Sequence, residues 1–167
     1  EQLELKGKPY RRQRHDLHRA QEHHSLQVST IGTENLEECR QVLDGWKARS
    51  HSYGESGLMD VAAGETMLRY FNALHVFGIL VKVGSSPAAV AAGYPLTESV
   101  FDLCVCQQIT SDPEISTFAR HALLENLEES VREVNGEEDL GIEGLRNLKE
   151  GLRPSRKIEM YAWTQRG

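Results

Sequence analysis

The sequence lacks the long apolar runs and the paired cysteines that mark membrane-spanning and disulfide-stabilised proteins. No apolar run approaches the roughly 20 residues that a membrane helix needs. Its three cysteines, Cys39, Cys104 and Cys106, are odd in number and lack the spacing of a disulfide framework or a zinc site. Because Cys104 and Cys106 lie two apart in an expected strand, they are predicted to share one face. We therefore expect a cytoplasmic protein with reduced thiols and no bound metal.

The sequence also lacks a serine or cysteine nucleophile motif and a secretory signal at its polar start. Its 167 residues suit one domain, which at this size buries about 70% of the unfolded surface. The net charge of −6 is uneven, with bases gathered in residues 6–19 and acids densest in residues 125–143. Such a basic stretch either binds an anionic partner or docks on the domain's own acidic surface, and the second case is the commoner.

Hydrophobic periodicity predicts an alternation of helices and strands. The predicted helices cover residues 8–24, 33–49, 60–74, 112–127 and 140–152. The predicted strands cover residues 26–31, 79–83, 88–96, 101–109, 131–134 and 157–163. The three middle strands form an antiparallel meander, and the later strand–helix–strand units predict parallel pairing. This α/β order, with a mixed antiparallel and parallel sheet flanked by helices, resembles the GNAT acyltransferase fold.

Turn and cap residues set the expected boundaries of these elements. Thr33 is a candidate N-cap for the second helix, and a Ser/Gly loop is predicted over residues 50–57. Gly78 is expected to end the segment before the meander. Asp112 and Pro113 open a helix, because proline costs nothing in the first turn, where its N–H has no partner.

The turn over residues 107–114 lies where GNAT enzymes bind the pyrophosphate of acyl-CoA. A helix N-terminus attracts anions through its unpaired N–H groups and its dipole. This turn, however, has no glycine, Pro113 removes one donor, and Asp112 and Glu114 would repel a pyrophosphate. The residues favour a capped helix start over a binding site for acyl-CoA.

Residues 135–149 form the most informative stretch. Asp139 is a candidate N-cap, and Gly141 and Gly144 are poor helix formers, which indicates a close backbone or ligand. Arg146 and Lys149 can lie on one helix face. Leucines of this helix are predicted to face the core, namely Leu145, Leu148 and Leu152. Acids at one end and bases on the flank suit either a bound zwitterion or ordinary surface ion pairs.

The stretch resembles a known family. Its motif reads Asn135-x-Glu137-Glu138-Asp139-Leu140-Gly141-Ile142-x-Gly144-Leu145-Arg146-x-x-Lys149, followed by Pro154 and Tyr161. It is similar to the C-terminal domain of bacterial phosphatidylglycerol lysyltransferases. The opening Gly7-Lys8-x-Tyr10-Arg11-x-x-Arg14, with Glu38-Cys39 and Trp46, resembles the start of the second half in two-half members. The resemblance implies that residues 1–167 are one GNAT-like domain, the C-terminal half of a longer protein, packed against a preceding GNAT-like half.

The resemblance also implies a reaction, the transfer of an acyl or aminoacyl group to a small amine or lipid headgroup, without insertion into the membrane. The implied donor is acyl-CoA or aminoacyl-tRNA. Residues implied at the transfer centre are Tyr94, Glu137 and Asp139, with Glu137 and Asp139 binding the substrate amine. Residues implied to bind the substrate are Asn135, Arg146 and Lys149, the last two through an anionic group or the tRNA end. Residues implied to contact tRNA phosphates are Lys8, Arg11, Arg12 and Arg14.

Two positions near the implied transfer centre differ from the family pattern. Tyr94 follows Gly93 where the family tends to have an acidic residue, and Cys106-Gln107-Gln108 replaces Glu-Lys-Ala. Two hypotheses from different classes therefore follow. The domain is a GNAT-like acyl- or aminoacyltransferase, or it is a non-catalytic ligand-binding or regulatory module.

Overall fold

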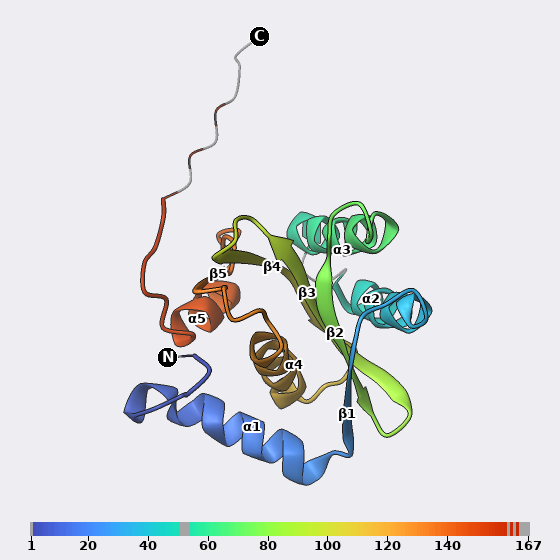
Figure 1. Ribbon diagram of the computed structural model, residues 1–167. Helices are drawn as coiled ribbons and strands as arrows, with labels where there is room; N and C mark the ends of the chain where they lie inside the picture. Colours follow the sequence, from blue (N-terminus) through green and yellow to red (C-terminus); the bar gives the residue numbers. More distant parts are fainter. Residues whose placement is uncertain (1, 51–53, 160, 162, 164–167) are drawn as a thin grey trace.

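The computed structural model describes residues 2–50, 54–159, 161 and 163. Its helical elements are a 3₁₀ turn at Lys8–Tyr10 followed by α1 (Arg11–His23), α2 (Leu36–Ser50), α3 (Gly54–Arg69), α4 (Pro113–Glu125) and α5 (Glu143–Gly151). Its strands are β1 (Leu26–Thr30), β2 (Phe77–Val83), β3 (Ser86–Pro95), β4 (Val100–Gln108) and β5 (Glu133–Asn135). Figure 1 shows these elements around one sheet.

The five strands lie in the order in which they occur along the chain, β1-β2-β3-β4-β5. The first four pair antiparallel, and β4 pairs parallel with β5 after the α4 crossover. The predicted mixed α/β sheet is therefore confirmed. The parallel pairing is short and ends at Asp102 opposite Asn135.

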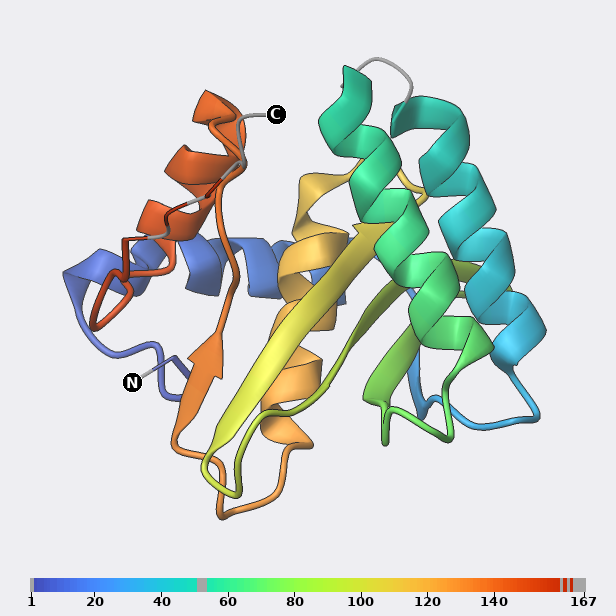
Figure 2. The ribbon, with the colours of Figure 1, turned by 90° about the horizontal axis from the view of Figure 1, so that it is seen from above.

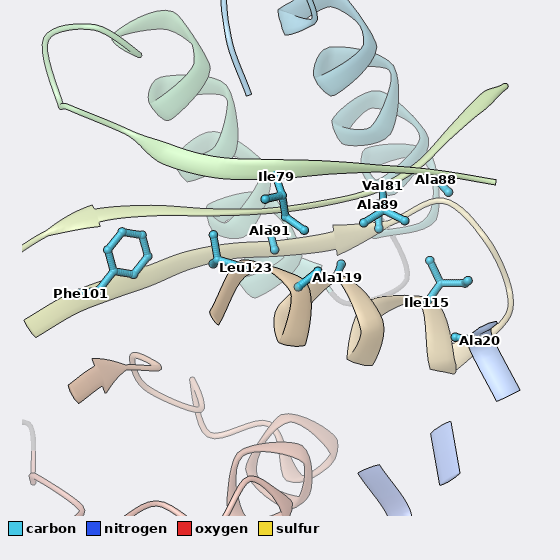
Figure 3. Packing of buried hydrophobic residues seen from close by; sticks show 11 residues of the cluster. Ala20, Ile79, Val81, Ala88, Ala89, Ala91, Phe101, Ile115, Ala119 and Leu123 are labelled. Atoms are coloured by element: carbon cyan, nitrogen blue, oxygen red, sulfur yellow. The ribbon is translucent and has the colours of Figure 1, made fainter. Parts of the chain in front are cut away.

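Helices cover both faces of the sheet because successive strand residues point to opposite sides. Ile79 and Val81 face α4, whose Ile115 and Leu123 are fully buried (Figure 3). Leu80, between them, packs with the core of α2 and α3 on the other face. Figure 2 shows the sheet between α4 and the α2–α3 pair, with α1 beyond α4.

The start of α2 corrects the predicted cap. The helix begins at Leu36, not after Thr33, because the Asn35 side chain closes the preceding turn. Asn35 Oδ1 accepts the N–H of Gly32 at 2.9 Å, and its Nδ2 donates to the carbonyl of Thr30 at 2.9 Å. Asn35 is therefore the residue that fixes the entry to this helix.

The predicted loop at residues 50–57 is shorter in the structure. Residue 50 ends α2, residues 54–57 already belong to α3, and residues 51–53 lie outside the described residues. Glycine and serine are unfavourable in a helix by up to about 1 kcal/mol each, and packing of the rest of α3 through Met67 and Leu68 overrides this cost. The helix also ends earlier than predicted, at Arg69.

Gly78 lies inside β2 and does not end a segment before it. A Cβ at this position would lie 2.5 Å from the Cβ of Ala92 on the neighbouring strand, so the glycine serves close packing. β5 covers Glu133–Asn135, two residues later than predicted at its start.

The C-terminal part differs most from the prediction. α5 begins at Glu143, because Leu140 and Gly141 have left-handed φ values of 52° and 72° and form a turn. It has no buried residue, and Leu148 is 50% exposed, so the prediction that its leucines face the core is wrong. The described residues of 157–163 form no strand, and Trp163 is 96% exposed. A strand needs a hydrogen-bonded neighbour, and the structure pairs this segment with none in its described residues.

Candidate functional site

A β-bulge between β3 and β4 organises the candidate site. Ala92 lies opposite Val105, and Tyr94 lies opposite Asp102, so Leu103 and Cys104 together face the single residue Gly93. A Cβ on Gly93 would lie 1.7 Å from the carbonyl oxygen of Asp102, so this position requires glycine. A bulge bends the strand and redirects its side chains, as is common beside functional sites.

The bulge also corrects the prediction that two cysteines share a face. The extra residue changes the alternation of β4, so Cys104 packs with the α2–α3 core and Cys106 packs against α4. Their thiols donate to the carbonyls of Ala92 and Ser116, respectively. Burial raises the pKa of Cys104 to about 12, with further contributions from the charges of Glu137 and Asp102. Cys104 is therefore protonated at neutral pH and is a poor nucleophile.

Asp102 is the buried acid at the centre of this site. It is only 5% exposed, and its Oδ1 accepts a hydrogen bond of 2.6 Å from Nδ2 of Asn135. The phenol of Tyr94 lies close enough to this carboxylate for the Asp102 charge to raise the Tyr94 pKa. Sequence reasoning missed Asp102, although an acid inside the expected apolar strand at residues 101–109 was a signal that could have found it.

The turn after β5 brings Glu137 toward the same place. Asn135 Oδ1 accepts the N–H of Glu137 at 3.2 Å, and Glu137 has a left-handed φ of 57°. Burial is the largest cause that raises the pKa of Tyr94. The nearby Asp102 and Cys104 raise it further, and so does the charge of Glu137, which therefore lies near the phenol. The structure thus brings together three predicted site residues, Tyr94, Asn135 and Glu137, around Asp102.

The other predicted site residues form a second, exposed group. Nε of Arg146 lies 2.5 Å from Oδ2 of Asp139, whose Oδ1 accepts the N–H of Gly141 at 2.9 Å. Arg146 is the main cause that lowers the pKa of Asp139 to about 2. Nζ of Lys149 donates to the backbone carbonyl of Glu138. Asp139 is not the helix N-cap that was predicted, because that position is Ile142 and Asp139 instead closes the preceding turn.

The basic residues at the start of the chain divide by their contacts. Arg14 donates to the backbone carbonyls of Leu5 and Gly7, so it shapes the N-terminal turn. Lys8, Arg11 and Arg12 are exposed, and Arg12 lies 3.9 Å from Asp16.

The same helix also docks on the domain itself. Arg19 of α1 lies 3.3 Å from Glu114, a buried acid in the first turn of α4. Within the basic segment, Arg19 of α1 therefore pairs with an acid of α4 in the same domain.

The turn between β4 and α4 lies where GNAT enzymes hold the pyrophosphate of acyl-CoA, and side chains of its own domain fill it. Arg49 of α2 donates to the carbonyls of Gln108 and Thr110, and its guanidinium lies 5.7 Å from the ring centre of Trp46. Ile109 packs over Gly45. A Cβ added to Gly45 would lie 2.3 Å from Cγ2 of Ile109, so the space beside this turn is filled. With acidic side chains at the helix start as well, these residues do not fit a pyrophosphate in the usual manner.

A small hollow between α1 and α4 is lined by Gln13, Thr117 and Arg120, among others, and by none of the six predicted site residues. No group of three or more His, Cys, Asp or Glu side chains within residues 2–50, 54–159, 161 and 163 is arranged to hold a metal ion. In the same residues, each helix is too short or too polar to cross a membrane.

Solved structures support the fold. A conserved protein of unknown function from Bacteroides thetaiotaomicron has a TM-score of 0.86 and 25% identity, over 93% of this chain and 53% of that protein. A GCN5-related N-acetyltransferase from Ralstonia eutropha has a TM-score of 0.57 and 15% identity, over 84% of this chain and 99% of the other. A ribosomal-protein-alanine N-acetyltransferase from Brucella melitensis biovar Abortus has a TM-score of 0.56 and 12% identity, over 86% and 99%.

The first of these comparisons also bears on length, because this chain spans about half of the Bacteroides protein. No curated protein matches the chain. The family model described as phosphatidylglycerol lysyltransferase, C-terminal, matches residues 1–164. The α/β order, the GNAT-like sheet and this match agree, and the chain belongs to the phosphatidylglycerol lysyltransferase C-terminal family.

Proposed function

We propose that this domain transfers an aminoacyl group from charged tRNA to a small amine or a lipid headgroup. The observation that carries the proposal is the cluster of Tyr94, Asp102, Asn135 and Glu137 at the point where β5 leaves β4. Family membership and a GNAT-like fold make acyl-group transfer the reaction class. The turn after β4 disfavours acyl-CoA, so aminoacyl-tRNA is the preferred donor.

The reaction joins the acceptor oxygen or nitrogen to the aminoacyl carbonyl carbon and breaks the bond to the ribose oxygen of tRNA. A proton must leave the acceptor, and one must reach the ribose oxygen. In our proposal the Glu137 carboxylate accepts the proton of the acceptor and then delivers it to the leaving ribose oxygen of tRNA. The Tyr94 phenol has one O–H, which in our proposal turns from Asp102 to the leaving oxygen or the developing oxyanion when the substrates bind.

In this proposal the exposed residues Asp139, Arg146 and Lys149 bind the ends of the substrates. Asp139 stays ionised down to about pH 2 and offers its negative charge to the amino group of the aminoacyl residue. Arg146 and Lys149 offer positive charge to a phosphate of the tRNA end or the lipid headgroup. The exposed Lys8, Arg11 and Arg12 supply further phosphate contacts to tRNA, whereas Arg14 is engaged by backbone carbonyls.

We also propose that the chain is the C-terminal half of a two-half protein and packs against a preceding GNAT-like half. The chain spans about half of the Bacteroides protein. The exposed apolar side chains Val134 and Leu148 on β5 and α5 offer a surface for such packing.

A non-catalytic ligand-binding module is the second candidate. It is favoured by the ion pair of 2.5 Å between Asp139 and Arg146, which holds both groups without a ligand. It is also favoured by Tyr94, which stands where the family tends to have an acid. This candidate predicts that an amino acid raises the thermal midpoint, since selective binding stabilises the folded state, but that no group is transferred.

The test is a transfer assay with radiolabelled aminoacyl-tRNA or acyl-CoA as donor and small amines or phosphatidylglycerol vesicles as acceptors. We expect transfer from aminoacyl-tRNA and a loss of roughly 10²-fold or more in Glu137→Gln, because general-base catalysis contributes 10²–10⁴. Glu138→Gln, which changes the neighbouring exposed acid, is the matched control and should retain activity. Absence of transfer from every donor would contradict the enzyme and favour the binding module.

A further inference from the structure

Asp102 is a buried charge with only neutral hydrogen-bond donors around it. Its carboxylate is 5% exposed, and within the described residues neither a lysine, an arginine nor a histidine forms an ion pair with it. The amide of Asn135 donates to it at 2.6 Å, and the phenol of Tyr94 lies near it. Since an ionised carboxylate is expensive to bury, its retention in an apolar strand requires these two contacts.

The sheet places the two donors on either side of Asp102. Tyr94 is its antiparallel partner on β3, and Asn135 is its parallel partner on β5. The β4–β5 pairing ends at this residue, and the bulge opposite Gly93 follows it directly. Asp102 therefore joins three strands at the point where the chain leaves the sheet toward Glu137.

The contacts continue from Asn135 to Glu137. The Asn135 amide donates to Asp102 through Nδ2 and accepts the backbone N–H of Glu137 through Oδ1. The bond to the Asp102 carboxylate therefore fixes which way the amide faces, since only an oxygen can accept the N–H of Glu137. This orientation holds the left-handed turn at Glu137.

We propose that Asp102 is the positioning residue of this site. It orients the Tyr94 phenol directly, and through the Asn135 amide it sets the turn that carries Glu137. The proposal rests on the proposed function for its catalytic meaning, but the positioning itself is a property of the free protein. Asp102 acts through Tyr94 and Glu137 and needs no contact with the substrate.

Asp102→Asn tests this chemistry because it keeps the shape and removes the charge. An asparagine lacks the negative charge of the aspartate, so its oxygen is a weaker acceptor for Tyr94 and Asn135 than the carboxylate is. The groups that face the Tyr94 phenol are Asp102 and Cys104 from β4 and Glu137 from the loop after β5. Removal of the Asp102 charge should therefore lower the Tyr94 pKa.

The measurement is an NMR titration of protein labelled with ¹³Cζ-tyrosine, in which Tyr94→Phe assigns the Tyr94 signal. We expect Asp102→Asn to lower the Tyr94 midpoint, because a neighbouring negative charge is removed, and to move the backbone amide signal of Glu137. Glu98→Gln, an exposed acid in the hairpin between β3 and β4, should change neither. A Tyr94 midpoint in Asp102→Asn equal to that of the parent would overturn the proposal.

Asn135→Ala is the second variant and keeps the test decisive if Asp102→Asn does not fold. It should move the amide signal of Glu137. It should leave Tyr94 beside Asp102, so the titration midpoint of Tyr94 should stay close to that of the parent. An unmoved Glu137 amide would overturn the connection through Asn135.

Transfer kinetics separate this proposal from the proposed function. We expect Asp102→Asn to lower kcat by about 10²-fold with little change in KM, because misplacement of reacting groups costs about that much. Parent protein without transfer activity but with the expected Tyr94 shift would overturn the proposed function alone. Normal kcat in a folded Asp102→Asn variant would overturn the positioning role alone.

Discussion

Asp102 and Asp139 are two carboxylates of one site region in opposite environments. Asp102 is buried and held by neutral donors, whereas Asp139 lies at the surface and pairs with the Arg146 guanidinium. An exposed ion pair contributes little to stability, so its effect appears mainly in the titration of the acid. The first acid can therefore organise the site, and the second can offer its charge to a ligand.

The titration of Asp139 gives a prediction for Arg146→Met. In the folded protein the Asp139 pKa is lowered from 3.8 to about 2, first by the Arg146 hydrogen bond and then by the Gly141 N–H. The stabilisation from this shift is present above about pH 4 and is lost as the pH falls through 2. Arg146→Met should return the Asp139 midpoint part of the way toward 3.8, as read by carboxyl ¹³C NMR.

Arg156→Met is the control for this titration, since Arg156 pairs with Glu133 at 2.5 Å and not with Asp139. An Asp139 midpoint that is the same in Arg146→Met and in the parent would show that Arg146 does not hold the carboxylate in solution.

The sequence identified the polar residues after β5 better than the acid inside β4. Asn135, Glu137, Asp139 and Arg146 form a dense motif, so their proximity could be predicted from a single turn and helix. Asp102 could not be placed in the same way, because its partners come from β3 and β5. Its role depends on strand register, which a bulge shifts without an obvious signal in the sequence.

At the scale of elements, the bulge at Gly93 connects the sheet to the site. It sets Tyr94 opposite Asp102 and changes the face to which Cys104 points. A glycine inside a strand was a recognisable signal, because it often marks a bulge or a close backbone contact. Only the register between β3 and β4 shows which residues lie opposite each other on either side of the bulge.

Gly93→Ala should unfold at lower urea concentration than the parent. A Cβ at this position meets the Asp102 carbonyl oxygen at 1.7 Å, and backbone cannot move aside cheaply. We expect a loss of roughly 1–3 kcal/mol or more in the free energy of unfolding. Gly136→Ala is the matched control, because no heavy atom lies within 4 Å of its added Cβ, and it should stay within roughly 0.5 kcal/mol of the parent. Equal effects of the two changes would contradict the described bulge.

Helices α4 and α5 show why amphipathic spacing predicted one buried face correctly and the other wrongly. Both carry apolar residues at helical spacing, but α4 packs on the sheet and α5 has no buried residue. Periodicity shows that a helix has an apolar face, and it does not show whether the same chain covers that face. The final predicted strand failed for the same reason, since pairing needs a neighbour.

Leu123→Ala and Leu148→Ala compare these two helices directly. Leu123 of α4 is fully buried, so its truncation should cost roughly 2–5 kcal/mol in the free energy of unfolding. Leu148 of α5 is 50% exposed, and its truncation should cost no more than roughly 0.5 kcal/mol. The measurement is urea unfolding at low protein concentration. A large loss in Leu148→Ala would show that the α5 face is covered in solution.

For the whole molecule, the fold class, the meander and the parallel crossover could be predicted, whereas the position of the first strand in the sheet and the C-terminal segment could not. The meander and the α4 crossover follow from local periodicity and from the rule for strand–helix–strand units. The C-terminal segment depends on contacts that the local sequence does not encode. Family membership and the GNAT-like sheet agree with the predicted reaction class, and the cluster around Asp102 gives that class a specific place.

In the proposed function the donor binds where β5 leaves β4 and not at the turn before α4. The direct measurement is a ¹H–¹⁵N NMR map of the parent protein with a stable amide analogue of aminoacyl-adenosine, compared with a map with CoA. We predict that the analogue shifts the backbone amides of Tyr94, Asp102 and Glu137 and that CoA shifts none of them. Shifts confined to residues 109–114, or shifts with CoA alone, would contradict the account.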